Sequence, residues 1–264
     1  MYSVRDALAA DFLGTLKAVK AMGYDGVEFA GLHGHTFEEV DAWCKEVGLQ
    51  VVSAHIPYEQ LLEDGETVIE GYKALGAKQV VIPSMPKDLR PESGNFAEFL
   101  EGTKKIGALC QEKGMILGYH NHDFEFKKIG EQYVLDVLYQ EVSADLLQTQ
   151  IDTCWANVGG VNPAEYVLQY AGRMYTVHIK DFVGQKNDNM YALIGVKDDA
   201  EKKAATQQEF ELRPVGYGVQ DVPAILKASA EAGAQWLVVE QDRPSMDKTP
   251  MECAEMSIQY LKTL

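Results

Sequence analysis

Apolar and polar positions repeat along the chain in one recurring unit, which is an amphipathic helix, a glycine and a short apolar run rich in β-branched residues. A glycine commonly ends a helix, and an apolar run of this length is typical of a buried strand. Five copies occupy residues 15–29, 39–53, 67–82, 102–120 and 224–240. Their glycines are Gly23, Gly48, Gly76, Gly114 and Gly233. The repeat predicts helices that alternate with strands.

Two further runs, residues 147–152 and 174–180, have strand character, and each follows a segment predicted to be a helix. Helices that alternate with buried strands are typical of parallel βαβ units with right-handed crossovers. Because a closed barrel needs eight strands, we expect residues 1–4 to form the end of a short or truncated first strand. The prediction is an α/β protein, a single-domain (β/α)8 TIM barrel over residues 1–264. An open doubly wound sheet is the alternative, but residues 5–8 lack the glycine-rich phosphate turn of that fold.

Metal-capable side chains occur where almost every predicted strand ends. These residues are Glu28, His55, His120, His122, Asp152, His178 and Glu240. Four of the six histidines of the chain belong to this set, and chance explains that distribution poorly. A TIM barrel has its active site at the C-terminal ends of its strands, so we expect one shared cavity. Mixed histidine and carboxylate ligands suit Mn, Zn, Co or Fe better than Ca, which predicts one divalent metal of undetermined identity.

Side chains alternate along a strand, so His120 and His122 should both point to the barrel axis while Asn121 points away. The same alternation pairs His178 with Lys180. His33 and His35 form a second histidine pair in the segment after an early strand. Such a pair is typical of a polar loop, and a substrate loop is the alternative.

Charge and cysteine content narrow the partners and the compartment. The formal net charge of -16 should repel nucleic acid and anionic membranes. The four cysteines, Cys44, Cys110, Cys154 and Cys253, form no C-x-x-C pair, which indicates reduced thiols and a cytoplasmic protein. No apolar run is long enough for a membrane helix and no signal peptide is recognisable. Assembly into a homo-oligomer is possible.

Several segments together resemble the xylose isomerase-like TIM-barrel superfamily, often called sugar phosphate isomerase/epimerase. They are residues 2–5 (YSVR), 23–28 (GYDGVE), 119–125 (YHNHDFE), Asp152, 178–181 (HIKD) and 240–242 (EQD). The resemblance covers essentially the whole chain. In that family several apolar residues usually precede the Tyr-Ser-x-Arg segment, which implies that the first strand is short or truncated here.

The resemblance implies roles for individual residues. Family members commonly bind one divalent ion through Glu, Asp, His and Glu, and the last three ligands fall on Asp152, His178 and Glu240. The first falls on His120, where many relatives have Glu. This departure implies a site with two histidines, a site completed by Glu125, or weakened metal binding.

The same resemblance implies the residues of the reaction and of the pocket. His122 matches a position used for substrate contact or proton transfer, and Glu240 is the other candidate base. The substrate-binding residues would be Glu28, His55, Glu125, Trp155 and Lys180. Residues 214–221 resemble the loop before the final helix, interpreted here as a turn followed by an aspartate helix cap.

The expected function is a divalent-metal-dependent isomerase or epimerase that acts on a small keto sugar or cyclitol through an enediolate. No phosphate cradle is recognisable, which favours an unphosphorylated substrate. A metal-dependent lyase or dehydratase of the inosose or 3-keto sugar type is the first alternative, and a non-catalytic sugar-binding or metal-binding barrel is the second. A phosphodiesterase of the endonuclease IV type would need three zinc ions and a basic groove, and the acidic charge disfavours it.

Overall fold

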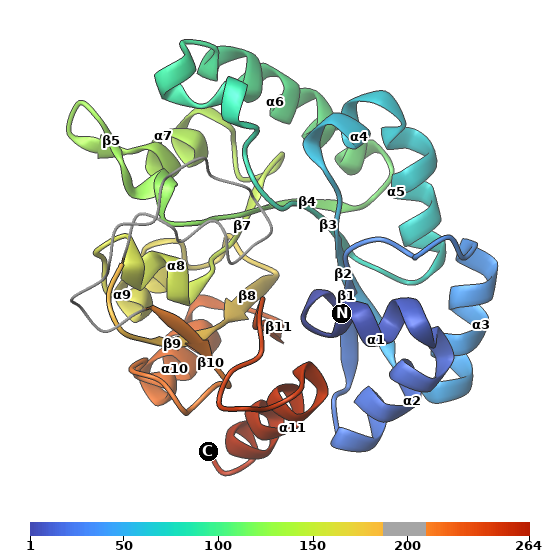
Figure 1. Ribbon diagram of the computed structural model, residues 1–264. Helices are drawn as coiled ribbons and strands as arrows, with labels where there is room; N and C mark the ends of the chain where they lie inside the picture. Colours follow the sequence, from blue (N-terminus) through green and yellow to red (C-terminus); the bar gives the residue numbers. More distant parts are fainter. Residues whose placement is uncertain (187–209) are drawn as a thin grey trace.

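Seven parallel strands form the wall of a barrel in the computed structural model, which describes residues 1–186 and 210–264 (Figure 1). Their order is β1-β2-β3-β4-β7-β8-β11, where two single bridges, Thr149 to Met174 and Asp152 to His178, join β7 to β8. The strands are β1 Gly26–Phe29, β2 Gln50–His55, β3 Gln79–Ile82, β4 Ile116–His120, β7 Gln148–Gln150, β8 Thr176–Ile179 and β11 Trp236–Val239. The five strands expected from the helix-glycine-strand pattern and the two expected from the further apolar runs are therefore all present.

Helices surround the strands (Figure 1). The longer helices are α2 Phe12–Met22, α3 Phe37–Val47, α5 Gly65–Ala74, α6 Phe96–Glu112, α7 Val134–Glu141, α9 Pro163–Gln169, α10 Val222–Ala232 and α11 Pro250–Leu261. Local sequence fixes their ends. Thr36 and Glu39 form a capping box at the start of α3, and Gly23 ends α2 with a φ of 102°, which a residue with a side chain rarely adopts.

Shorter elements lie mainly at the strand ends. They are the helices α1 Arg5–Ala10, α4 Tyr58–Glu63 and α8 Thr153–Val158, the 3-10 turns η1 Tyr2–Val4, η2 Lys87–Leu89, η3 Pro91–Ser93 and η4 Phe124–Phe126, and the hairpins β5 Lys128–Ile129 with β6 Gln132–Tyr133 and β9 Asp181–Val183 with β10 Glu211–Arg213. Many of these elements follow a barrel strand, so they place side chains around the C-terminal mouth of the barrel. No helix within the described ranges is both long and apolar enough to cross a membrane.

The expectation that residues 1–4 form part of a strand is wrong. Tyr2–Val4 is a 3-10 turn, because Val4 N–H donates to the Met1 carbonyl and Arg5 donates to the Tyr2 carbonyl. Within the described residues, β1 and β11 do not pair with each other or with an eighth strand. A small groove with a volume of about 80 Å³ lies between them.

The centre of the barrel is polar. The Gln150 amide donates to the Thr176 hydroxyl at 2.7 Å, and that hydroxyl donates to Gln79 at 2.7 Å. The same Gln150 nitrogen also lies 2.7 Å from a carboxylate oxygen of Glu28. A chain of buried hydrogen bonds therefore runs from the barrel interior to the strand ends, where it meets the histidines.

Candidate functional site

Four metal-capable side chains converge at the C-terminal mouth of the barrel. His120 ends β4, Asp152 follows β7, His178 lies in β8 and Glu240 follows β11. One ligand atom from each lies within 4.8 Å of the others, and all four residues are buried. Chain segments that are far apart in sequence meet here because parallel barrel strands all end at the same mouth.

Each histidine of this group uses one ring nitrogen to hold its orientation. His178 Nε2 lies 2.8 Å from Glu28 Oε1, and His120 Nδ1 lies 3.2 Å from Gln150 Oε1. The other nitrogens face the acidic groups: His178 Nδ1 is 3.2 Å from Glu240 Oε2, and His120 Nε2 is 3.7 Å from Asp152 Oδ2. Metal-binding histidines typically have such a carboxylate or carbonyl partner on the far nitrogen.

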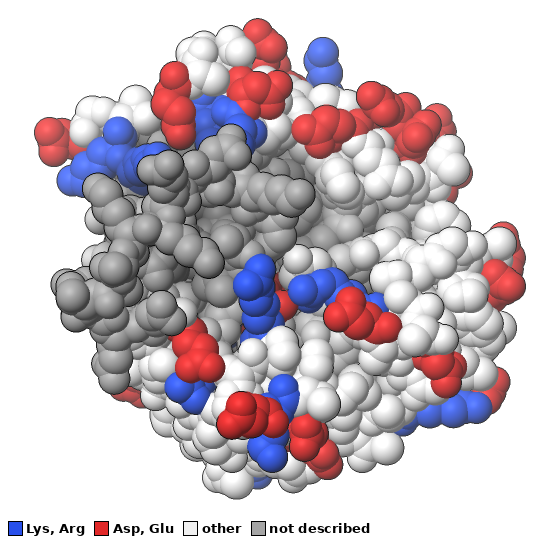
Figure 2. Space-filling view, in the orientation of Figure 1, with Lys and Arg blue, Asp and Glu red and all other residues white. Residues whose placement is uncertain are grey.

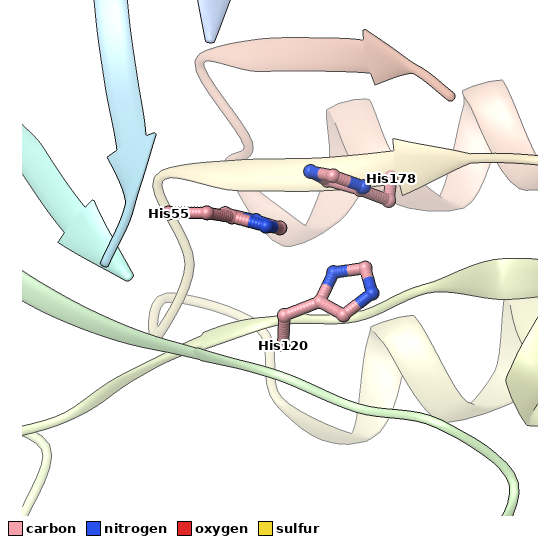
Figure 3. Close-up of side chains that lie close together, drawn as sticks. All are labelled: His55, His120 and His178. Atoms are coloured by element: carbon pink, nitrogen blue, oxygen red, sulfur yellow. The ribbon is translucent and has the colours of Figure 1, made fainter. Parts of the chain in front are cut away.

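His55 forms an alternative three-histidine group with His120 and His178, and Figure 3 shows the three rings facing one another. His55 Nε2 is already 2.7 Å from Gln150 Oε1 and 3.1 Å from Glu28 Oε1. Glu28 and Gln150 therefore already contact nitrogen atoms of the three rings. The set with Asp152 and Glu240 is the better metal candidate.

Asp152 is placed by the local sequence. Its Oδ1 accepts the Trp155 N–H at 2.9 Å and caps α8, while Asn121 Oδ1 accepts the Asp152 N–H at 2.9 Å. The second carboxylate oxygen, Oδ2, is buried and accepts no hydrogen bond from the described residues, although Lys180 Nζ lies 3.2 Å away. An unsatisfied buried carboxylate oxygen beside two imidazoles fits a divalent cation.

Lys180 lies at the centre of the acidic groups. Its Nζ is 2.8 Å from Glu240 Oε2, 3.2 Å from Asp152 Oδ2 and 3.2 Å from Asp242 Oδ2. All these groups are buried. Burial opposes the charge on Lys180, but the surrounding Asp152, Asp242 and Glu240 raise its pKa well above the ordinary value. The ammonium is therefore charged and balances part of the carboxylate charge.

Two further pKa shifts reflect the pairing of opposite charges at the site. Burial opposes protonation of His178, yet Glu28 and Glu240 raise its pKa to about 10. Burial also disfavours an ionised Glu240, but Lys180 and His178 hold its pKa well below the ordinary range. His178 holds a proton between two carboxylates, and a divalent cation can replace that proton.

His122 lies two residues beyond the end of β4, so it belongs to a loop and not to the strand assumed for the alternation argument. It still lines the same cavity as His120. Burial, with Lys180 nearby, lowers its pKa to about 3, so the ring is neutral. Its Nδ1 is buried and makes no hydrogen bond within the described residues.

Glu125 is neither a metal ligand nor a cavity residue in the described structure. Its carboxylate accepts the His122 N–H at 2.8 Å and the Tyr119 hydroxyl at 2.5 Å, and it is fully buried. It thereby holds the main chain at His122. Glu125 does not belong to the group of metal-capable side chains, which His120 completes.

The cavity has a volume of about 670 Å³. His55, His120, His122, Lys180 and Glu240 line it as expected, and so does His35 from the second histidine pair. Besides Glu125, two more of the expected substrate-binding residues do not line it. Trp155 is fully buried, with Lys180 Nζ 5.4 Å from its ring, and Glu28 lies beneath the histidines.

Two residues of the site were not predicted from the sequence. Gln150 joins His55, His120 and Glu28, and its position two residues before Asp152 could have placed it on the same face of the strand. Asp242 lines the cavity and contacts Lys180.

Residues 214–221 form the expected turn and cap: three of their N–H groups donate to Asp181, and Asp221 caps α10.

Comparison with known proteins gives a consistent result. The family model described as "Xylose isomerase-like TIM barrel" matches residues 16–264. An inosose dehydratase of Clostridium botulinum is 24% identical over 91% of this chain and 85% of its own. A crystal structure of a sugar phosphate isomerase/epimerase from Parabacteroides distasonis superimposes with a TM-score of 0.79 at 18% identity, covering 100% of this chain and 96% of that one. The structure of 3-keto-D-glucoside 4-epimerase from E. coli has a TM-score of 0.66 at 19% identity, covering 96% and 94%.

Proposed function

The chain belongs to the xylose isomerase-like TIM-barrel family, and from this premise we propose that it is a divalent-metal-dependent isomerase or epimerase of a keto sugar or cyclitol. The observation that carries the proposal is the convergence of His120, Asp152, His178 and Glu240 beside a cavity of about 670 Å³. Relatives named for reactions on inososes and keto sugars support a sugar-modifying enzyme. A bound cation would polarise the substrate carbonyl and stabilise the enediolate that forms when the adjacent carbon loses its proton.

The four ligand side chains would hold the cation, and their neighbours would keep them in place. Glu28 orients His178 through Nε2 at 2.8 Å, and Gln150 orients His120. Asp152 keeps Oδ2 for the cation because Oδ1 is used in the helix cap. The identity of the metal, Mn, Zn, Co or Fe, stays part of the proposal.

His122 is the favoured base. The ring is neutral and lines the cavity, so it can accept a proton from the substrate carbon. Glu240 is a poorer candidate, because Lys180 and His178 already contact its carboxylate and hold its pKa low. Return of the proton to the opposite face gives epimerisation, and its transfer to the neighbouring carbon gives isomerisation.

Dehydration is the second candidate, and Asp242 is the observation that favours it. Loss of a β-hydroxyl needs an acid near the leaving oxygen. Burial raises the pKa of Asp242 to about 6, and its side chain lines the cavity beside Lys180. A carboxyl that is partly protonated near neutral pH can donate the proton that the leaving hydroxyl needs.

The test is exchange of carbon-bound hydrogen with solvent. The protein is incubated in D2O with keto sugars and inososes, each with Mn, Co, Zn or Fe(II), and followed by NMR. The proposal expects deuterium at the carbon next to the carbonyl only when a cation is present, and no exchange in Asp152→Asn. Rearranged products identify an isomerase or epimerase, and loss of water identifies the dehydratase. Absence of exchange with every pair would overturn both candidates.

A further inference from the structure

His122 lies in the loop after β4, and its main chain and its ring are held by different contacts. Glu125 accepts the His122 N–H at 2.8 Å, which holds the main chain. This contact does not fix the ring plane, because the torsion that turns an imidazole about its bond to Cβ has a broad energy minimum. The orientation of the ring therefore depends on what packs against it.

Three rings pack against the His122 imidazole. His120 lies edge-on with centroids 5.3 Å apart, and Trp155 lies at 5.7 Å with the two planes tilted by 38°. Phe124 lies parallel to the imidazole, with centroids 5.8 Å apart and an angle of 9° between the planes. Of these three rings, Phe124 is therefore the one that can fix the imidazole plane by stacking.

Phe124 is in turn held by Arg90. Phe124 begins η4, a 3-10 turn of three residues, and the hydrogen-bond geometry of such a turn is poorer than that of an α-helix. The Phe124 side chain is buried, and the guanidinium carbon of Arg90 lies 3.5 Å from its ring centroid. A cation over the face of an aromatic ring is attracted by the ring electrons. Phe124 therefore connects Arg90 to His122.

Arg90 is itself fixed in the segment after β3. It stands between η2 and η3, its Nε donates to the Met85 carbonyl at 3.4 Å, and its own carbonyl accepts the Ser93 hydroxyl at 2.6 Å and the Ser93 N–H at 2.9 Å. β3 ends at Ile82, which is not a metal-capable residue. The segment after β3 therefore reaches the site through packing and not through a ligand.

We propose that Arg90 is a positioning residue that acts on His122 through Phe124. The inference rests on the proposed function, in which His122 accepts the proton of the substrate carbon. Arg90 holds the Phe124 ring, and the Phe124 ring holds the plane of the imidazole, so that the imidazole meets the substrate carbon at a constant angle. Proton transfer depends on this alignment, and misplacement of a reacting group by about 1 Å can cost about 10²-fold in rate.

The first measurement follows the ring and needs no substrate. Protein with isotope-labelled histidine is supplied with Zn²⁺, which is diamagnetic, and the ring signals of His122 are assigned in NMR spectra by their loss in His122→Ala. In Arg90→Met these signals should shift or broaden, because the ring loses its fixed orientation, while the signals of His33 and His35 stay the same. Unchanged His122 signals in Arg90→Met would overturn the inference.

The second measurement is the rate of deuterium exchange into 2-keto-myo-inositol in the presence of Mn²⁺. In Arg90→Met and in Phe124→Leu, kcat should fall by about 10- to 100-fold while KM and bound metal stay the same, because the altered residues are neither metal candidates nor cavity residues. Arg90→Lys keeps a cation and Phe124→Tyr keeps an aromatic face, so each should recover part of the rate. Loss of bound metal, or no recovery in either conservative variant, would indicate a merely structural role and overturn the inference.

Lys128→Met is the matched control. Lys128 Nζ lies 5.7 Å from the Tyr133 ring centroid in the β5–β6 hairpin. Figure 2 shows Lys and Arg side chains on the surface in the region where Figure 1 places β5. This variant loses a contact of the same kind away from His122, so its rate and its His122 signals should match wild type. A loss of rate equal to that of Arg90→Met would contradict the inference.

A double variant separates this inference from the proposed function. If Arg90 acts through His122, Arg90→Met should cause no further loss of rate when it is added to His122→Ala. A further loss would show that Arg90 acts by another route. Failure of the proposed function appears differently, as an exchange rate in His122→Ala equal to wild type or as no exchange in wild type, and the NMR signals of His122 still report whether Arg90 holds its ring.

Discussion

Glu28 and His178 form a buried pair that decides which nitrogen of the imidazole faces the metal candidates. Glu28 Oε1 lies 2.8 Å from Nε2, which leaves Nδ1 directed toward Glu240, 3.2 Å away. A carboxylate can only accept at this contact when ionised, so Nε2 carries the proton and Nδ1 supplies the lone pair to a cation. Glu28 therefore acts on the metal through His178.

Glu28→Gln tests this relationship. The variant keeps the shape of the side chain but removes the negative partner, and metal affinity should fall by about 10- to 100-fold, the usual effect of losing such an outer partner. Competition with a chelator measures it. Ser53→Ala is the control, because it removes only the 2.6 Å hydrogen bond to Glu28 Oε2 and keeps the carboxylate. Equal metal affinity in wild type and Glu28→Gln would contradict the role.

Glu125 gives the fold a predictable dependence on pH. Burial raises the pKa of Glu125 to about 7 from an ordinary value of 4.5. Between these pH values the folded state keeps a proton that the unfolded state has lost, so the free energy of unfolding falls as pH rises, by about 1.4 kcal/mol per pH unit at most. Above the folded pKa the loss is complete.

Glu125→Gln cannot titrate and should lack this slope. Urea unfolding of both proteins from about pH 5 to about pH 7 measures it, and the stability of wild type relative to the variant should decrease steadily with pH. Tyr139→Phe is a useful control, because it removes a neighbouring buried hydroxyl that donates to the Tyr119 carbonyl and leaves the carboxyl in place. Parallel stability curves for wild type and Glu125→Gln would show that Glu125 is ionised in the folded protein.

Most of the architecture could be predicted from the sequence because local signals and packing agree. The glycines that end the helices and the apolar runs after them locate five barrel strands, and two further apolar runs locate the other two. The match of the family model to residues 16–264 confirms the resemblance. The prediction of a first strand at residues 1–4 had no such support from a preceding helix and glycine. Among the described residues, Tyr2–Val4 has no strand partner on either side, and Arg5 contacts with the Tyr2 and Asp242 carbonyls stabilise a turn instead.

The metal candidates were also predictable, because all barrel strands end at one mouth and the sequence shows which side chains follow each strand. The hydrogen bonds between residues that are far apart in sequence could not be predicted. Gln150 contacts three of the predicted residues, and only its spacing of two residues from Asp152 points to the site. His122 lines the cavity, as predicted, but it lies in a loop after β4. The alternation of side chains along a strand is therefore not the reason for its position.

The cysteines give a prediction about chemical modification. Cys44, Cys110, Cys154 and Cys253 are free and buried, and burial raises the pKa of Cys154 well above its ordinary value. Thiolate formation and access are both suppressed, so a thiol reagent should label the native protein slowly and all four sites after unfolding. Titration with Ellman's reagent, with and without denaturant, measures this. Rapid loss of one equivalent, mapped to Cys154 beside Asp152, would contradict the prediction.

His122 and Asp152 should separate proton transfer from metal binding. Asp152 is one of the four metal candidates, whereas His122 lines the cavity and does not belong to that group. If His122 transfers the proton, His122→Ala should keep its metal and lose about 10²- to 10⁴-fold in turnover, the usual contribution of a general base.

Asp152→Ala should instead lose the metal, because it removes one of four ligands and leaves three that are held by Glu28, Gln150 and Lys180. Bound metal measured by plasma mass spectrometry beside the rate of exchange distinguishes the two variants. His120→Ala completes the comparison, since His120 Nε2 lies 3.7 Å from Asp152 Oδ2 and should behave as a ligand. If His122→Ala emptied the site while His120→Ala kept its metal, the loop histidine would be the ligand and the strand histidine the base.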